Sequence, residues 1–380
     1  MAAALTATAA VAPAVPASAA SCSNPGQPVN VGTHDNYLQG LALVAPCNVW
    51  AVGFFNNGTA NQTLVERWKD GSWTHVASPN PGGSKRPDEL YGVATSGSNA
   101  WAVGDTSTGA ALETLVLRWN GTAWTRVPSP NPGGHARRNV LYAVTALSGS
   151  NAWAVGYFFD GTAFQTLVLH WDGGSWKRVP SPNPGGHAEN DVLFGIAAIS
   201  SSNAWAVGYT ADGTLHQTLV LHWDGSAWKR VPSPSPGGPH HHDYLEGVSA
   251  TSASNAWAVG DFSGAETPNQ TLVERWNGTA WKIVPSPDPG GSDQLNTLNG
   301  VSATSATDVW AAGYYEGSTS DQTLLLRWNG SSWKQMPSPN PAGSVHLALV
   351  EVVGIAATSA WAVGSWTDNS VSRTLAARCC

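Results

Sequence analysis

The segment Asn151–Gly156, which reads Asn-Ala-Trp-Ala-Val-Gly, decides how the rest of this chain is interpreted. It occurs seven times with small variations, and its tryptophan is found at Trp50, Trp101, Trp153, Trp205, Trp257, Trp310 and Trp361. Successive copies are 51, 52, 52, 52, 53 and 51 residues apart. A period this regular indicates one supersecondary unit copied along the chain.

One unit contains four short runs of β-forming residues. In the third copy they are Leu141–Leu147, Asn151–Phe159, Gln165–Trp171 and Trp176–Ser181. Asp172-Gly173 separates the last two runs, and Asp-Gly favours a tight hairpin turn. A Pro-Asn-Pro-Gly-Gly segment then ends the unit. Four short antiparallel strands per unit, here called A to D, repeated seven times, predict an all-β, seven-bladed β-propeller.

Nineteen of the 20 tryptophans occupy repeated positions. Besides the seven in strand B, six end strand C and six begin strand D. The two further sets are Trp68, Trp119, Trp171, Trp223, Trp276 and Trp328, and Trp73, Trp124, Trp176, Trp228, Trp281 and Trp333. We expect them to pack between blades. Small residues recur in strand A, at Gly92, Ala143, Gly195, Gly247 and Gly300, and we expect them to allow close approach of the blades at the axis.

The last unit ends after three strands, at Cys380. The segment Ser21–Gly26 resembles the Ser-Pro-Asn-Pro-Gly that follows the other D strands, so we expect the N-terminal segment to complete blade seven and close the ring. Four cysteines, Cys22, Cys47, Cys379 and Cys380, lie near the two ends. Disulfides of unknown connectivity and free buried thiols both remain open. This register places Cys22 at the opposite end of the blade from Cys379, and Cys47 on the face of Cys379 and Cys380.

Residues 1–20 differ from the rest of the chain. They carry no charge and end in small residues, which is typical of an export signal, although the basic start of such a signal is missing. A tail without structure and lipid attachment at Cys22 are the alternatives. We therefore expect a signal segment at 1–20, a single propeller domain at 21–380 and a secreted, extracellular protein. No apolar run is long enough for a transmembrane helix.

Charge excludes one class of partner. The net charge is -7, and no basic run is longer than two residues, as in Lys85-Arg86 and Arg137-Arg138, so we expect no nucleic-acid partner. The run His240–His242 suggests a metal site, but adjacent residues of an extended chain point to alternate sides, which favours a solvated loop. We expect no metal and no cofactor.

Two motifs carry a resemblance to known families. Trp-Lys-Arg-Val-Pro after a turn, with a strand B that ends in Gly, resembles the kelch repeat. The turn Trp223–Trp228 resembles the Asp box of sialidase-like propellers, although both matches are incomplete. The chain as a whole is most similar to secreted bacterial propeller-repeat proteins with Ala-Trp-Ala-Val-Gly and Pro-Ser-Pro-Asn-Pro-Gly-Gly segments. The resemblance covers Asn36 to Cys380 and implies the fold, but it names no activity.

Differences between the copies indicate where a ligand would bind. The A–B and C–D turns hardly change, whereas the B–C and D–A connections vary and emerge together on the other face. The fifth residue after the repeated tryptophan is aromatic in five copies, at Phe55, Phe158, Phe262, Tyr315 and Trp366. We expect these rings, with Asp160, Asp212, Arg137 and Arg138, to bind the ligand, and Trp366 to be the most exposed. The alternative is that the rings cap the core.

These features favour a secreted, monomeric, non-enzymatic propeller that binds glycans or another extracellular surface on its variable face. A polysaccharide hydrolase or lyase at the same face is the second hypothesis, and a scaffold for protein partners is the third. No complete catalytic motif is present in the sequence.

Overall fold

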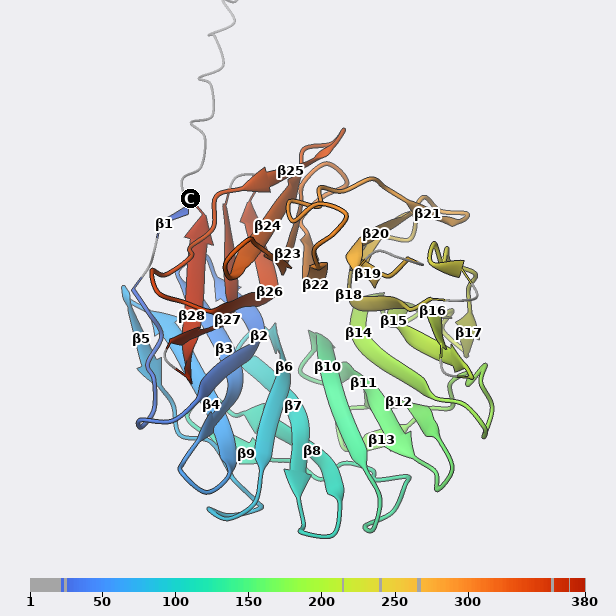
Figure 1. Cartoon of the computed structure of the whole chain (residues 1–380). Coiled ribbons are helices and arrows are strands. Elements are labelled where there is room, and N and C mark those ends of the chain that lie inside the picture. The colour runs from blue at the N-terminus through green and yellow to red at the C-terminus, as the bar shows by residue number, and fades with distance from the viewer. Residues whose placement is uncertain are drawn as a thin grey trace, which may run out of the picture.

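The computed structural model describes residues 22–23, 26–213, 215–238, 241–264, 268–356, 359–368 and 370–379. Within these ranges the elements are strands, and they form seven four-stranded antiparallel sheets around a central axis (Figure 1). This confirms the all-β, seven-bladed architecture. Residues 1–20, His240 and Cys380, on which predictions were made, lie outside the described residues.

Each blade runs from strand A at the axis to strand D at the rim. Blades one to four are β2 (Asn36–Ala45), β3 (Asn48–Asn56), β4 (Asn61–Lys69) and β5 (Ser72–His75); β6 (Asp88–Ser96), β7 (Asn99–Ser107), β8 (Leu112–Trp119) and β9 (Trp124–Arg126); β10 (Asn139–Ser148), β11 (Asn151–Phe159), β12 (Phe164–Trp171) and β13 (Trp176–Arg178); β14 (Asp191–Ser200), β15 (Asn203–Asp212), β16 (Leu215–Trp223) and β17 (Trp228–Arg230). Blades five to seven are β18 (Asp243–Ser252), β19 (Asn255–Phe262), β20 (Gln270–Trp276) and β21 (Trp281–Ile283); β22 (Asn296–Ala303), β23 (Val309–Glu316), β24 (Asp321–Trp328) and β25 (Trp333–Met336); β26 (His346–Ala356), β27 (Ser359–Asp368), β28 (Val371–Cys379) and β1 (Cys22–Ser23).

The repeated tryptophan of strand B joins each blade to the next. The ring of Trp153 is 2% exposed and lies 5.1 Å from that of Trp223 and 5.6 Å from that of Trp228, both in the following blade. On its own blade His170 lies 4.2 Å from the same ring. Equivalent pairs of contacts join five other blade junctions, and we call these interlocked side chains the tryptophan belt. Because large rings are enclosed by two sheets, the belt holds the blades together.

Two glycine positions reflect close backbone contacts. A Cβ on Gly156, the last residue of the repeated segment, would lie 2.0 Å from the carbonyl oxygen of Val140 in strand A. A Cβ on Gly92 would lie 2.7 Å from the carbonyl oxygen of Tyr142 in the next blade. Neither place has room for a side chain, which explains the small residues predicted to line the axis.

The second repeated motif, Pro-Ser-Pro-Asn-Pro-Gly-Gly, attaches the end of each blade to strand C. In blade three the Thr166 amide donates to Asn183 Oδ1 at 2.6 Å, and Thr166 Oγ1 lies 2.7 Å from Ser181 Oγ. The same Thr–Ser pair occurs at 2.6–2.7 Å in blades one to six. The motif therefore has a structural role.

The N-terminal segment lies along the outer strand of the last blade, in agreement with the predicted closure. Thr374, the copy of this threonine in blade seven, donates its amide to Asn30 Oδ1 at 3.0 Å and its hydroxyl to the carbonyl oxygen of Pro28 at 3.3 Å. Pro28 and Asn30, rather than Ser21–Gly26, thus replace the Ser-Pro-Asn motif, which corrects the predicted alignment.

This corrected alignment also changes the position of the cysteines. Cys22 is the direct register partner of Cys379 instead of lying at the opposite end of the blade. The two residues occupy the positions of the cross-strand tryptophan pair of the other blades, such as Trp171 and Trp176. Cys47 is an exposed free thiol, and Arg378 Nη2 lies 3.8 Å from its Sγ.

Candidate functional site

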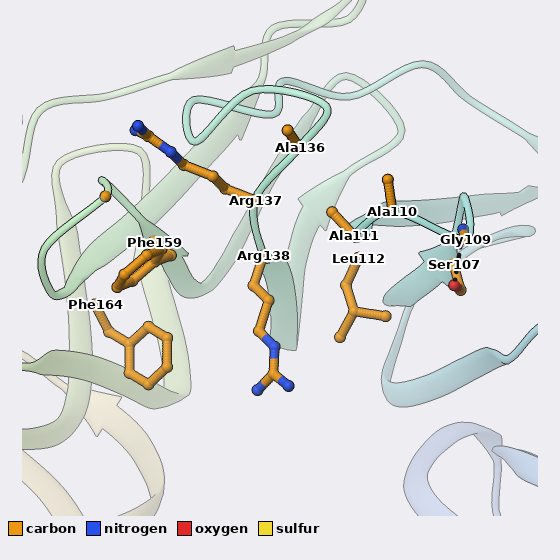
Figure 2. Close-up of a pocket in the computed structure, with 11 residues that line it drawn as sticks. Ser107, Gly109, Ala110, Ala111, Leu112, Ala136, Arg137, Arg138, Phe159 and Phe164 are labelled. Atoms are coloured by element: carbon orange, nitrogen blue, oxygen red, sulfur yellow. Dashed lines mark hydrogen bonds between the residues drawn. The ribbon is translucent and has the colours of Figure 1, made fainter.

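The loops that vary between copies enclose a cavity of about 720 Å³ between blades two and three, which we call the rim cavity (Figure 2). Its walls come from the β7–β8 loop, the β9–β10 loop and the β11–β12 loop. The lining residues are Ser107, Gly109, Ala110, Ala111, Leu112, Ala136, Arg137, Arg138, Phe159, Gly161 and Phe164. Two guanidinium groups and two phenyl rings therefore meet in one hollow.

The two arginines of the rim cavity point in different directions. Figure 2 shows Arg138 extending between Leu112 and Phe164, whereas Arg137 reaches toward the loop that follows Phe159. Arg137 Nη1 donates to the carbonyl oxygen of Asp160. Both side chains are exposed, and no ion pair joins either of them to a carboxylate of the described residues. Arg138 also interacts with the side chain of Tyr157, so each guanidinium has one uncharged partner and retains further donors.

Asp160 shapes the edge of the cavity. Its Oδ1 accepts hydrogen bonds from the amides of Thr162 at 2.8 Å and Ala163 at 3.0 Å, and its Oδ2 lies 2.6 Å from His187 Nδ1. The hydrogen bond from His187, aided by the two amides, lowers the pKa of Asp160 to about 2. The carboxylate is engaged in holding the loop, so its contribution to the cavity is positional.

The five aromatic residues predicted to bind a ligand lie in five different blades. Phe158 is buried, with the guanidinium carbon of Arg178 4.5 Å from its ring centre. The other four are half-buried, and each packs against a separate hydrophobic cluster between blades: Phe55, Phe262, Tyr315 and Trp366. The structure therefore does not bring these rings together, and Trp366 is half-buried like Phe55, Phe262 and Tyr315.

Tyr315 and Asp212, like the other predicted aromatic residues, do not line the rim cavity. Tyr315 borders a hollow of about 510 Å³ on blade six, formed with the loop Glu316–Ser320. Asp212 is exposed at the end of β15. Of the nine predicted site residues, only Arg137, Arg138 and Asp160 lie together.

A second hollow, of about 490 Å³, follows the axis, and we call it the axial channel. Every strand A has a β-bulge at one position, as between Leu141 and Ala143. The extra residue of each bulge is half-buried and lines the channel. In blade order these residues are Gln39, Tyr91, Tyr142, Phe194, Glu246, Asn299 and Val350. A bulge redirects a side chain, and here it turns one variable residue per blade toward the axis.

Sequence reasoning missed the axial channel. The repeated small residue, such as Ala143, is visible in the sequence, whereas the variable residue directly before it is recognised only when the seven copies are compared at that position. A comparison at that position finds two tyrosines, a phenylalanine and a glutamate where the neighbouring positions hardly change.

The channel has an unusual concentration of carboxyl groups near phenols. Tyr91 Oη donates to Glu89 Oε2 at 2.5 Å and lies 3.1 Å from Asp105 Oδ2. Burial, and then the charge of Glu89, raise the pKa of Asp105 to about 7. Burial, and then the charge of Asp261, raise the pKa of Glu246 to about 8. Of these acids Glu246 lines the axial channel, whereas Glu89 and Asp105 contact its wall residue Tyr91.

No group of three His, Cys, Asp or Glu residues is placed to hold a metal ion in the part of the chain that the structure describes. His242 Nδ1 lies 3.1 Å from His216 Nδ1, and His216 Nδ1 lies 2.5 Å from Tyr244 Oη. This His–His–Tyr contact is the only interaction that the described part of the His240–His242 run makes with other imidazoles. The described residues also contain no helix long and apolar enough to cross a membrane.

Comparison with known proteins identifies the fold. No family model and no curated protein sequence matches the chain. Among solved structures, YCF48 from Cyanidioschyzon merolae is similar at 17% identity and a TM-score of 0.56, covering 94% of this chain and 98% of that one. A polysaccharide lyase, an ulvan lyase, is similar at 8% identity and a TM-score of 0.57, covering 94% and 96%. The WD40 propeller domain of Doa1 is similar at 11% identity and a TM-score of 0.55, covering 93% and 96%. At these identities the likeness shows the propeller fold alone.

Proposed function

We propose that this protein is a secreted, non-enzymatic propeller that binds acidic glycans in the rim cavity. The observation that carries the proposal is the meeting of Arg137 and Arg138 with Phe159 and Phe164 in a hollow of about 720 Å³. Guanidinium groups bind carboxylate and sulfate oxygens through paired, charge-assisted hydrogen bonds. Aromatic rings offer a flat apolar surface to the face of a sugar ring.

The size and charge of the cavity support this ligand class. A volume of this order is typical of small-molecule sites and would hold a short oligosaccharide. The protein carries a net charge of -7, so a local positive site is selective for an anion rather than part of a general basic surface. A similar propeller, the ulvan lyase, has been solved with the bound saccharide -[GlcA(1-4)Rha3S]-, which contains acidic sugars.

The predicted residues fall into two groups under this proposal. Arg137 and Arg138 would contact the ligand, and Asp160 would hold the loop that carries Gly161. The aromatic contacts would come from Phe159 and Phe164, which neighbour the predicted Phe158. Phe55, Phe262, Tyr315, Trp366 and Asp212 remain predicted contacts for a longer glycan that extends across the variable face.

A glycan array probed with the full chain tests the proposal. We expect uronate-containing and sulfated glycans to bind and neutral glycans to bind at least tenfold more weakly, a difference typical of charge-assisted contacts. Arg137→Ala and Arg138→Ala should each weaken binding by about tenfold. Absence of binding to every glycan on the array, or equal binding of neutral and acidic glycans, would contradict the proposal.

Arg86 offers a matched control. A Cβ on Gly161 would lie 2.8 Å from Arg137 Cζ, and one on Gly109 would lie 3.0 Å from Arg86 Cζ, so both arginines cover a loop glycine. Arg86 does not line the rim cavity. Arg86→Ala should therefore leave glycan binding nearly unchanged, and an equal loss in both variants would mean that loop rigidity, and not the guanidinium, is responsible.

The second candidate is a polysaccharide lyase or hydrolase, and one observation favours it. Asp105, with a pKa raised to about 7 by burial, touches the hydroxyl of Tyr91, and a group with a pKa near neutrality is suited to proton transfer. Release of new chain ends from a labelled acidic polysaccharide would establish this candidate, and its loss in Asp105→Asn would locate the reaction.

A further inference from the structure

The axial channel has two chemically different walls. Blades two to four contribute the rings of Tyr91, Tyr142 and Phe194, whose neighbouring centres are 5.3 and 5.2 Å apart. Blades five to seven contribute Glu246, Asn299 and Glu351. A continuous aromatic surface thus faces two carboxyl groups across one hollow of about 490 Å³.

Glu351 breaks the repeat at a place where the repeat is otherwise strict. The other six blades have Gly or Ala at this position, directly after the bulge. A Cβ on Gly300 would lie 2.7 Å from Glu351 Oε1 and 2.9 Å from Glu351 Cα, so this carboxylate lies directly over the backbone of blade six. Asn299 holds the same edge, because its Nδ2 donates to the carbonyl oxygen of Leu349 at 2.8 Å. The carboxylate is held at the channel wall by backbone contacts.

Neither carboxylate has a cationic partner. Glu246 accepts no hydrogen bond from the described residues, and Glu351 accepts one, from the amide of Val352 at 2.9 Å. No ion pair within the described ranges includes either residue. Burial raises the pKa of Glu351 to about 8, as it does for Glu246. Both acids are half-buried at the wall of a hollow and lack a cationic partner, so this arrangement gains from a positive ligand.

Glu246 lies within electrostatic reach of two phenols of the channel wall. Besides burial, the charge of Glu246 contributes to the raised pKa of Tyr142 on one side and of Tyr314 on the other. A cation held by Glu246 would therefore also face aromatic rings. The faces of such rings attract cations, and cages of this kind bind ammonium groups.

The chemistry of the walls distinguishes between kinds of cation. Metal ions of the calcium or magnesium type need six or more oxygen ligands in close convergence. The described residues offer no group of three candidate ligands, and three neighbouring bulge positions of the channel wall are aromatic. An organic ammonium group, with its diffuse charge and apolar methyl or methylene surface, fits both walls.

We propose that the axial channel is a second binding site, which takes a compact organic ammonium ligand between the rings of Tyr91, Tyr142 and Phe194 and the carboxylates of Glu246 and Glu351. The site is separate from the rim cavity and does not depend on glycan binding. Choline is a suitable probe, and dimethylbutanol, its uncharged carbon isostere, is the matched control ligand.

Calorimetric titration of the full chain with both probes tests this site. We expect choline to bind at least tenfold more tightly than dimethylbutanol, since the isostere lacks the charge. Glu246→Gln and Glu351→Gln keep the shape of the side chain and should each weaken choline binding by about tenfold. Asp293→Asn, which removes an exposed charge on a D–A loop outside the channel, should change it less than twofold, within the range of surface charges.

A pair of variants at Tyr142 separates the aromatic contribution from folding. Tyr142→Phe keeps the ring face and should retain choline binding, whereas Tyr142→Leu fills similar space without a ring and should weaken it about fivefold. Equal binding of choline and its isostere, no binding of choline, or calcium binding that competes with choline would each overturn the proposal. Arg137→Ala should leave choline binding intact, which separates this outcome from failure of the glycan site.

Discussion

The tryptophan belt and the axial channel use positions on two neighbouring strands of each blade, but the seven copies conserve the first and vary the second. Trp153 is identical in all copies and is enclosed by two sheets. Tyr142, on the neighbouring strand, corresponds to Gln, Tyr, Phe, Glu, Asn or Val in the other blades. A belt residue must fit rings on both sides, whereas a bulge residue leaves the strand pairing and faces open space. The propeller can therefore change its ligand chemistry without changing its core.

The largest expected difference between the two regions is in stability. Trp101→Ala should lower the free energy of unfolding by about 3–5 kcal/mol, because it opens a cavity between two blades. Phe194→Ala, in the channel wall, should cost about 1 kcal/mol, because one side of the ring already faces open space. Denaturant titration measures both, and similar losses would show that the channel wall is part of the core.

The belt itself contains an internal test. The ring of Trp101 contacts Trp171 and Trp176 of the next blade, whereas the register positions equivalent to these two tryptophans in blade seven, the blade that follows Trp310, are Cys379 and Cys22. Trp310→Ala should therefore destabilise the protein less than Trp101→Ala. The denaturant concentration at which half of each variant is unfolded measures this difference. A lower midpoint for Trp310→Ala than for Trp101→Ala would contradict the role given to the ring contacts.

The closure of blade seven suggests the next effect. Because Cys22 and Cys379 are register partners on adjacent strands, we expect them to form a disulfide under oxidising conditions. It would link the two ends of the chain and contribute about 2–4 kcal/mol, as disulfides that close long loops do. Peptide mapping without reduction identifies the pair. Cys22→Ser should then lower the melting temperature, while Cys47→Ser, at an exposed free thiol, should not.

A smaller effect, of opposite sign, is expected in the core. Glu274 is fully buried, and neither carboxylate oxygen has a hydrogen-bond partner among the described residues. Four other blades have Leu at this position, as at Leu169 and Leu221. Glu274→Leu should therefore stabilise the protein by about 1–3 kcal/mol, the cost of an unsatisfied buried group. Glu66→Leu should gain less, because it loses the hydrogen bond from the Val29 amide. A destabilised Glu274→Leu would indicate an unrecognised partner.

The stability of the protein should also depend on pH. Burial raises the pKa of Glu66 from 4.5 to about 8, so the folded state holds this proton more tightly than the unfolded state does. The stabilisation that comes from this proton should be complete below the pKa of the unfolded state and should decrease as the pH rises from about 4.5 to about 8. The raised pKa values of Glu246 and Glu351 act in the same direction. Denaturant titrations at pH 5 and pH 8 measure the slope, which Glu66→Gln should reduce; a slope of opposite sign would contradict the assignment.

The fold was predictable because the signal was repeated. The spacing of Trp153 and its copies established seven blades, and the Asp-Gly turn at Asp172 placed strands C and D. The closing strand was predicted, but its register was wrong, because the resemblance of Ser21–Gly26 to the motif concealed that Asn30 and Pro28 contact Thr374. Local similarity does not reveal which copy of a motif satisfies a particular amide.

The site was predictable only in part. Variable loops led to Arg137 and Arg138, which line one hollow, and to Asp160, whose carbonyl oxygen accepts a hydrogen bond from Arg137. The rings at Phe158 and its equivalents point into separate cores, which follows from strand register and cannot be read from loop variation. The channel at Tyr142 depends on a bulge, and one unpaired residue leaves no mark on the pattern of a short strand.

The separation between the tryptophan belt and the axial channel is tested most directly by one variant, measured for both unfolding free energy and choline binding. Replacing Tyr91, Tyr142 and Phe194 together by Val, the residue at the bulge of blade seven, changes three channel positions and no belt residue. We expect this triple variant to lose less unfolding free energy than Trp101→Ala alone, and to lose choline binding. Unfolding of the variant, or unchanged choline binding in a folded variant, would contradict the separation between a belt that carries the fold and a channel that carries ligand chemistry.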